Sequence, residues 1–523
     1  MTNFPDDACT PVETVELSAS GLEAEQVVAV ARKRVPAALG SAARAAMERS
    51  AAVVSALVDS EEPVYGVSTG FGSLAAVPIP AARREELQRA LIRSHAAGMG
   101  NPVETEVVRA MMLLRARTLA MGCSGARPVV ADTLLALLNA GLTPAVPEYG
   151  SLGASGDLAP LAHCALALIG EGEVRDASGE LRPAAAALGE AGIAPLTLIA
   201  KEGLALINGT DGMLGMLVLA CEDLTALLRV ADVTAAMSVE ALLGTDRAFA
   251  ADLVGLRPQP GQAASAENLC ALLADSEIVA SHRHGDPRVQ DAYSLRCAAQ
   301  VHGACADAID YLRRVLDVEL NAGTDNPLVL PDDDVVLSGG NFHGEPLAIA
   351  LDLAGIALSE LGSISERRLF RMLAGFLSEL PPFLTRHSGL DSGYMLLQYT
   401  AAALATDNQL LATPASVHSL PTSADQEDHN SMGWHSAQRA RQVSINVETI
   451  LALEALAAAQ GIDLLSPLQP APMTGEAHAA IREKVASLDH DRTLYPEIEA
   501  AVALVRSGRL ATIAARARPL TRS

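Results

Sequence analysis

Residues 151–163 read SLGASGDLAPLAH, a run of small residues that leads into an apolar helix. A plain structural interpretation is a tight loop in which Ser155 or Asp157 caps the helix that follows. A second interpretation is the nucleophile turn of a serine hydrolase, G-x-S-x-G. That pattern requires glycine at position 157, where this chain has Asp157, so the hydrolase interpretation is disfavoured.

The sequence around this run is helical in character. Half of the 523 residues are hydrophobic, Ala and Leu predominate, and only 3% are aromatic. Ala and Leu favour helices, and long helices rich in small aliphatic side chains must bury broad faces against one another. We therefore expect a mostly α fold built around a bundle of long, near-antiparallel helices.

The expected elements divide the chain into three parts. Helices are expected in the first part at 22–50, with an interruption at Pro36, and at 81–97, 102–121, 128–140 and 158–169. Long apolar runs then fill 203–229, 231–244, 263–274, 294–318, 344–377, 393–411 and 434–459. Short hairpins are expected within 171–195, before a short helix, and at 328–337. The predicted domains are 1–200, 201–466 and a helical tail at 467–523.

Composition restricts the partners and the compartment. The net charge of −24 repels nucleic acid and anionic membranes, so we expect a small-molecule partner. Seven scattered cysteines without a CxxC pair indicate free thiols rather than disulfides or zinc. His282 and His284 flank Arg283 but lack a third ligand at a suitable spacing, so we expect no metal site. The acidic N-terminus does not resemble a signal peptide, which favours the cytoplasm.

The full run at 151–163 resembles the family of ammonia-lyases and aminomutases that build a 4-methylidene-imidazol-5-one (MIO) group. The resemblance implies that Ala154, Ser155 and Gly156 cyclise and lose two waters to give this electrophile, without an exogenous cofactor. The residue types suit that reaction, because Gly156 has no Cβ to block a close backbone approach and Ser155 can dehydrate to an alkene. An electrophile is what ordinary side chains lack. The resemblance also implies that the N-terminal domain carries this loop.

Residues 65–72 (YGVSTGFG) resemble the tyrosine loop of the same family. Tyr65 matches the tyrosine that abstracts the β-proton, a role that requires its pKa to fall from about 10. Ser68 stands where many relatives have Asn, and His418 where many have Asp. The alternative is a glycine-rich loop with a packing tyrosine, whereas a phosphate loop is excluded because no G-K-S/T follows.

Two remote positions point to the same substrate. Ser94-His95-Ala96 is the pattern that the resemblance assigns to histidine-specific members, and His95 matches the selector of the substrate side chain. Glu427, in the segment 419–429, matches a carboxylate of those members, where members acting on other aromatic amino acids have Gln. A carboxylate can accept an imidazole N–H but offers nothing useful to a phenyl ring. Taken alone, His95 could be an ordinary helical histidine, and residues 425–428 a solvated turn.

Further blocks supply the remaining expected site residues. The resemblance implies that Asn208 hydrogen-bonds the MIO ring or the substrate, and that Arg296 clamps the substrate carboxylate through two N–H donors. It implies that Tyr293 assists proton movement or ring formation, that Gln290 adds a polar contact, and that Phe342 keeps water from the electrophile. The plain alternatives are a helix-end Asn-Gly turn for Asn208, an ion pair for Arg296 and a core aromatic for Phe342.

The activity implied by the resemblance is elimination of ammonia from L-histidine to give trans-urocanate. Family members are homotetramers whose active sites combine several subunits, so Tyr65, Asn208 and Arg296 need not share a chain. A tyrosine-specific lyase or aminomutase with the same electrophile is the nearest alternative. A serine hydrolase and a non-catalytic helical assembly are the others.

Overall fold

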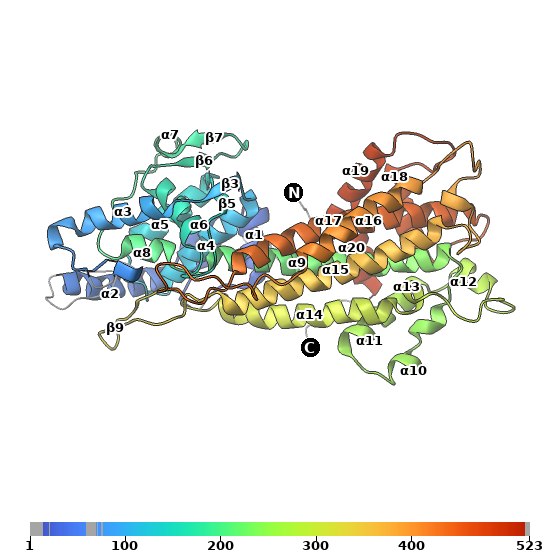
Figure 1. Cartoon of the computed structure of the whole chain (residues 1–523), viewed down its shortest axis with the longest axis horizontal. Coiled ribbons are helices and arrows are strands. Elements are labelled where there is room, and N and C mark those ends of the chain that lie inside the picture. The colour runs from blue at the N-terminus through green and yellow to red at the C-terminus, as the bar shows by residue number, and fades with distance from the viewer. Residues whose placement is uncertain (1–13, 20, 59–68, 71, 75–76, 518–523) are drawn as a thin grey trace.

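The computed structural model describes residues 14–19, 21–58, 69–70, 72–74 and 77–517. Figure 1 shows an elongated molecule in which an N-terminal lobe lies at one end of a bundle of long helices, and shorter helices cover the other end. Strands are few and short in the described residues. The predicted mostly α fold, with a long central bundle and a smaller N-terminal lobe that carries residues 151–157, is confirmed.

The N-terminal lobe combines helices with small strand pairs. Its helices are α1 (Ala24–Arg32), α2 (Ser41–Val58), α3 (Arg84–His95), α4 (Thr105–Ala120), α5 (Pro128–Asn139), α6 (Leu158–Leu168), α7 (Ala184–Glu190) and α8 (Glu202–Ile207), with 3-10 turns η1 (Gly72–Leu74) and η2 (Ala81–Arg83). Its strands are β1 (Val15–Leu17), β2 (Ala37–Leu39), β3 (Met99–Pro102), β4 (Thr143–Pro144), β5 (Pro147–Tyr149), β6 (Glu173–Arg175) and β7 (Leu181–Pro183). β1 pairs with β2 in parallel, β3 with β5 antiparallel, and β4–β6–β7 form an antiparallel sheet.

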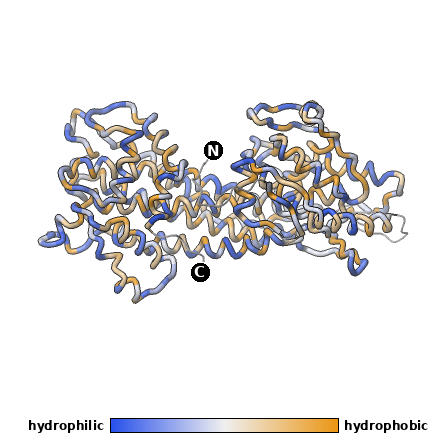
Figure 2. The backbone as a smooth tube through the Cα atoms, turned by 180° about the vertical axis from the view of Figure 1, so that it is seen from behind, coloured by the Kyte–Doolittle hydropathy of each residue, from blue (hydrophilic) through white to orange (hydrophobic). Residues whose placement is uncertain are grey.

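Five long helices form the bundle: α9 (Asp211–Ala241), α14 (Ala298–Glu319), α15 (Glu345–Leu373), α16 (Met395–Leu411) and α17 (Gly433–Leu464). α9 is the central helix, since 28 of its 31 residues are buried. It packs against α14, α15 and α17. Figure 2 shows hydrophobic residues along the lobe and the bundle alike, and most of the buried ones form one core that runs through both. The Ala-rich composition therefore acts as expected, letting helices bury nearly all their faces.

Shorter elements complete the far end of the bundle. They are η3 (Asp246–Phe249), α10 (Ala251–Val254), α11 (Pro260–Leu272), α12 (Glu277–Ser281), α13 (Tyr293–Arg296), η4 (Pro382–Leu384), α18 (Pro472–Lys484), α19 (Tyr495–Arg506) and α20 (Arg509–Ala517). α19 packs on α17, and α20 packs on α9. The hairpin β8 (Leu328–Leu330) and β9 (Val335–Leu337) is antiparallel, as predicted, and projects near the lobe.

One predicted helix boundary is wrong. The sequence favoured a break near Val230, but α9 continues through it because Val230 and its neighbours are buried on all sides of the bundle. The break lies instead at residues 208–210, between α8 and α9, where Asn208 and Gly209 interrupt the helix. α8 packs against α3 and α6 of the lobe. This break places Asn208 next to residues 151–157.

Two bundle helices, α15 and α17, are long and apolar enough to cross a membrane by length and composition alone. Buried residues make up 61% of the apolar window of α15 and 83% of that of α17. Such burial against neighbouring helices is what core helices of a bundle show.

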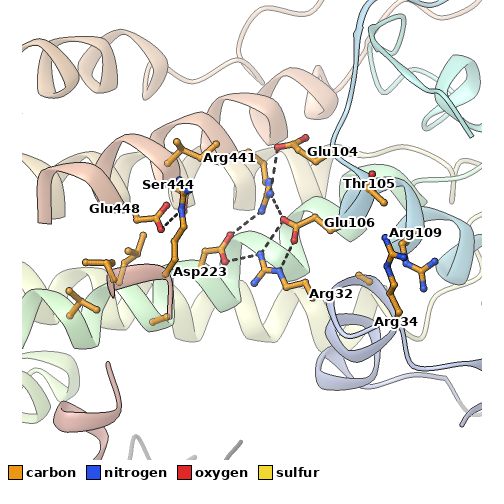
Figure 3. A pocket seen from close by; sticks show the side chains of 17 residues that line it. Arg32, Arg34, Glu104, Thr105, Glu106, Arg109, Asp223, Arg441, Ser444 and Glu448 are labelled. Atoms are coloured by element: carbon orange, nitrogen blue, oxygen red, sulfur yellow. Dashed lines mark hydrogen bonds and ion pairs between the residues drawn. The ribbon is translucent and has the colours of Figure 1, made fainter. Parts of the chain in front are cut away.

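A cluster of buried charges joins the lobe to the bundle (Figure 3). Arg32 of α1 binds Glu106 of α4 at 2.9 Å and Asp223 of α9 at 2.8 Å. Arg441 of α17 binds the same two carboxylates from the other side. The cluster lines a cavity of about 400 Å³. Because four helices contribute to it, these ion pairs fix the lobe relative to α9 and α17.

Candidate active site

The loop at residues 151–157 connects β5 to α6 and rests against Gly209. Gly153 and Gly156 both have left-handed backbones, with φ of 67° and 72°. A Cβ at Gly156 would lie only 2.0 Å from the carbonyl oxygen of Gly209. The backbone N–H of Asp157 also donates to that oxygen, at 2.7 Å. Glycine is therefore required at position 156 both by its backbone angle and by this close approach.

Ser155 is half-buried, and its hydroxyl donates to the side-chain oxygen of Asn208 at 2.8 Å. The Asn208 side chain is buried, and its NH₂ group donates to the Asn326 carbonyl at 2.9 Å and to Asp325 at 3.3 Å. The Asn208 carbonyl accepts from Arg115 at 2.7 Å. Asn208 is thus held at both ends, with its amide oxygen directed at Ser155.

Asp157 does not cap its own helix, as the plain interpretation of the sequence would have it. No side-chain cap bond is present at the start of α6, and the Asp157 carboxylate instead accepts the backbone N–H groups of Gly212 and Met213, at 2.8 and 2.9 Å. Those groups lie at the start of α9, where unpaired N–H donors favour an anion. Burial nonetheless raises the pKa of Asp157 to about 7. Asp157 therefore ties the 151–157 loop to the central helix.

Segments distant in sequence complete the surroundings of this loop. Ser431 donates to the Gly153 carbonyl at 3.2 Å, and the N–H of Met432 donates to the Leu152 carbonyl at 2.8 Å. The start of α17 is therefore in direct contact with the loop. The ring of His343 lies 3.0 Å from the carbonyl oxygen of His429 and stacks on its ring. That contact brings residues 338–344, including the half-buried Phe342, beside the segment 419–431.

His95 and Glu427, which the sequence linked to one substrate, lie near enough for the charge of Glu427 to act on the His95 imidazole. His95 ends α3, and burial lowers the pKa of its imidazole, while a backbone contact to Leu91 and the charge of Glu427 partly oppose this. The Nδ1 atom of His95 lies 2.9 Å from the Leu91 carbonyl oxygen. Because a carbonyl can only accept, Nδ1 carries the proton and Nε2 of the neutral ring keeps a lone pair.

The half-buried Glu427 has one oxygen engaged, since Thr422 donates to its Oε2 at 2.7 Å. The predicted catalytic Tyr65 lies outside the described residues. Described residues of the same loop do reach the 419–429 segment, because a Cβ at Gly72 would lie 2.8 Å from the hydroxyl of Ser423.

Three other predicted site residues lie at the opposite end of the bundle. Tyr293 and Arg296 form α13, and Gln290 precedes it. Figure 1 places α13 at the far end from α3, α6 and α8. Arg288 attaches this segment to the end of α9, because it donates to the carbonyl of Leu242, the residue directly after α9. The 31 residues of α9 span about 45 Å. Within one chain, therefore, this group does not meet Ser155.

Tyr293 and Arg296, at the far end of the bundle, contact one another. Tyr293 is 71% exposed, and the guanidinium of Arg296 lies 4.6 Å from the centre of its ring. The Nε atom of Arg296 is buried and has no hydrogen-bond partner among the described residues. A partly exposed arginine guanidinium beside an exposed tyrosine is suited to bind an anionic group.

The charged loop at 282–284 has structural contacts. His282 lies 2.9 Å from the Gly244 carbonyl oxygen, and Arg283 binds Asp246 at 3.0 Å. Within the part of the chain that the structure describes, no cluster of three His, Cys, Asp or Glu side chains could hold a metal ion.

Sequence reasoning missed several residues that support the site. Lys201, Asp325 and Ser431 all contact residues 151–157 or Asn208 directly or through one partner. Lys201 and Asp325 belong to segments that the sequence had singled out, but neither was given a role. The sequence does indicate that Lys201, next to an apolar run, would need a charged partner if it were buried, but it does not indicate which carboxylate.

Known proteins are similar to this chain in both sequence and fold. The aromatic amino acid lyase family matches residues 22–483. A histidine ammonia-lyase of Streptomyces avermitilis is 52% identical over 96% of this chain and 98% of its own length. The crystal structure of histidine ammonia-lyase from Trypanosoma cruzi is 40% identical with a TM-score of 0.89, covering 97% of this chain and 96% of that one. A tyrosine aminomutase from Streptomyces globisporus is 37% identical with a TM-score of 0.90, covering 97% and 99%.

These similarities extend over nearly the whole length of each protein, and the arrangement of Ser155, Asn208 and Gly156 lies within the matched region. The chain belongs to the aromatic amino acid lyase family.

Proposed function

We propose that this protein is an ammonia-lyase that converts L-histidine to trans-urocanate and ammonia, the first step of histidine degradation. The observation that carries the proposal is the Ser155 loop held by Asn208, with His95 and Glu427 near one another at the same end of the molecule. The neutral His95 ring and the Glu427 carboxylate are both acceptors, and they suit the ring N–H groups of a histidine side chain, which are one in the neutral and two in the protonated form. The relatives named histidine ammonia-lyase support the same substrate.

The electrophile that we propose is an MIO group formed from Ala154, Ser155 and Gly156, with no exogenous cofactor. The described residues fit it, because Gly156 tolerates the close backbone approach and the Ser155 hydroxyl is held by Asn208. When formed, this group would accept the substrate electrons that ordinary side chains cannot.

The side chains of the chain would then bind the substrate and move protons. Arg296 would hold the substrate carboxylate, with Gln290 as a further polar contact, while His95 and Glu427 would hold the imidazole. Tyr65 would remove the β-proton, and Tyr293 would assist proton movement. Phe342 would exclude water, and Asn208 would contact the ring or the substrate.

The two groups of site residues require more than one copy of the chain. Ser155 and Arg296 are separated by about the length of α9 in one chain, so an active site that uses both must combine copies. Large apolar side chains are exposed along the bundle, and they are candidates for burial between copies: Ile349, Ile356, Leu396, Tyr399 and Leu410. We propose a homotetramer with shared active sites, as the family resemblance implies.

The remaining assignments follow from composition. The net charge of −24 disfavours nucleic acid and anionic membranes as partners. We propose a cytoplasmic location, and a division of the chain into 1–200, 201–466 and 467–523.

A tyrosine-specific lyase or aminomutase is the second candidate, because a tyrosine aminomutase has nearly the same fold. The test is a parallel ultraviolet assay of the purified protein with L-histidine, L-tyrosine and L-phenylalanine, since each elimination product is a conjugated acrylate with its own absorption. Urocanate from histidine supports the proposal. Coumarate from tyrosine, without a reaction of histidine, would overturn the substrate assignment and retain the fold.

A further inference from the structure

Hydrogen bonds connect Ser155 through Asn208 and Asp325 to Lys201, so the chain of contacts ends in a buried ion pair. Ser155 donates to Asn208 at 2.8 Å, and Asn208 donates to Oδ1 of Asp325 at 3.3 Å. The other oxygen of Asp325 binds the ammonium of Lys201 at 2.6 Å. Lys201 and Asp325 have no exposed side-chain surface.

A buried ion pair such as Lys201–Asp325 adds little to the stability of the fold compared with an apolar pair. Two buried charges lose their hydration, and a well-packed apolar pair of the same volume is often as stable or more stable. Lys201 also has a left-handed backbone, with φ of 64°, a conformation that is unfavourable for a residue other than glycine. We therefore expect the Lys201–Asp325 pair to have a role that an apolar pair could not have, and the contacts of Asp325 indicate that role.

Asp325 and the Asn326 carbonyl together determine which way the Asn208 amide faces. Its Oδ1 atom accepts from the Asn208 NH₂ group and from the backbone N–H of Asn326, at 2.7 Å. The carbonyl oxygen of Asn326 also accepts from that NH₂ group, at 2.9 Å. Both neighbours are acceptors, so a flipped Asn208 would set oxygen against oxygen. The amide oxygen must therefore face Ser155, where it receives the hydroxyl proton and fixes the rotamer of Ser155.

We propose that Lys201 and Asp325 are positioning residues for the maturation of Ser155, acting through Asn208. The proposal rests on the proposed function, because it concerns formation of the electrophile. Lys201 holds the Asp325 carboxylate in place, Asp325 keeps the Asn208 amide in one orientation, and Asn208 holds the Ser155 hydroxyl in place while it is expelled. An alternative in which the pair only stabilises the fold predicts lower stability with normal maturation.

The maturation step balances without an oxidant. The Gly156 nitrogen forms a bond to the Ala154 carbonyl carbon. The Ala154 carbonyl oxygen then leaves as water, together with one hydrogen from the Gly156 nitrogen and one from the Ser155 nitrogen. Ser155 then loses its α-hydrogen and its hydroxyl as a second water, leaving a carbon–carbon double bond. The product is lighter than the unprocessed tripeptide by two waters.

The test is mass spectrometry of the peptide that contains residues 154–156, from full-length protein purified as a folded, soluble species. The variants are Lys201→Met, which removes the cation, and Asp325→Asn, which keeps the shape and volume of the carboxylate. The matched control is Glu454→Gln, the same change in another ion pair without exposed side chains, formed with Arg368. Glu454 lies 22 residues beyond Met432 on α17, roughly 30 Å from the loop.

We expect wild type and Glu454→Gln to show the two-water deficit, and folded Lys201→Met and Asp325→Asn to retain mostly the full-mass peptide. Complete deficits in both folded variants would overturn this proposal while leaving the proposed function intact. If Lys201→Met does not fold, Asp325→Asn decides alone, because it preserves packing. A full-mass peptide in the wild type would instead contradict the proposed function. Incomplete maturation of Glu454→Gln, equal to that of Asp325→Asn, would show that any loss of a buried pair has this effect, and would also overturn the proposal.

Discussion

The carboxylate of Glu427 raises the pKa of the His95 imidazole, although burial lowers it by more. The two side chains come from the end of α3 and from the loop before α17, and the Glu427 oxygen is itself held by Thr422. A half-buried, neutral imidazole near a carboxylate offers one acceptor that is uncharged and one that is charged. A phenyl ring has no donor for these acceptors and a phenol has one, whereas a protonated imidazole has two.

Glu427→Gln should lower kcat/KM for L-histidine by about 10- to 100-fold, because a hydrogen bond to a charged group contributes roughly 1.5–3 kcal/mol. The matched control is Asp425→Asn, an exposed carboxylate of the same loop whose left-handed backbone Asn tolerates. Steady-state urocanate assays of both variants check this. A Glu427→Gln enzyme within twofold of wild type would remove Glu427 from the binding site.

The pH dependence of histidine turnover should report on His95. Burial sets the pKa of His95 below its usual 6.5, so the ring is neutral at pH 7 and becomes charged only as the pH falls further. Protonation removes the Nε2 acceptor, so activity should fall on the acid side as His95 gains its proton. Glu427 raises this pKa, and Glu427→Gln should therefore shift the acid limb to lower pH. Profiles of kcat/KM against pH for wild type, Glu427→Gln and the non-titrating His95→Gln test this. A limb that stays unchanged in His95→Gln would assign it to another group.

The charge cluster between the lobe and the bundle should contribute to stability but not to substrate choice (Figure 3). Asp223→Asn leaves Arg32 and Arg441 each without one carboxylate partner, and both arginine side chains are at least nine-tenths buried. We expect a loss of roughly 2–4 kcal/mol in the free energy of unfolding, somewhat below that of a fully enclosed pair. Urea unfolding at matched protein concentration measures it. Asp132→Asn, which breaks the exposed pair with Arg44, is the control and should change little.

Two inactive variants should restore activity to one another if active sites combine subunits. Ser155→Ala removes the residue proposed to dehydrate, and Arg296→Ala removes the proposed carboxylate clamp in α13, at the other end of the bundle. When equal amounts of the two chains assemble at random, roughly a quarter of the sites receive both intact residues. Co-expression and a urocanate assay measure this. Mixed assemblies that stay as inactive as either parent would contradict a site shared between copies.

Much of the fold could be predicted from local pattern. The Ala- and Leu-rich runs at 344–377 and 434–459 correspond to α15 and α17, and the alternation at 328–337 corresponds to the β8–β9 hairpin. The break at 208–210 could not be located in this way, because burial within the bundle keeps α9 helical through Val230. Local sequence determines which segments are helical, whereas packing determines where long helices end.

The candidate site, like the fold, could be predicted from the sequence only in part. The roles of Asn208 and Glu427 came from the family resemblance, and the contacts of both are compatible with those roles. The Lys201–Asp325 pair joins residues 124 positions apart, and no local pattern states which carboxylate a buried lysine meets. The separation of Arg296 from Ser155 also depends on the whole length of α9, which only the folded bundle reveals.

The most direct test of the account compares wild type with Ser155→Ala in a urocanate assay with L-histidine. The account predicts that wild type forms urocanate, and that Ser155→Ala, folded and with unchanged unfolding behaviour, forms essentially none because residue 155 can no longer dehydrate. A Ser155→Ala protein that forms urocanate at the wild-type rate would contradict the central claim that elimination depends on an electrophile made from Ala154, Ser155 and Gly156.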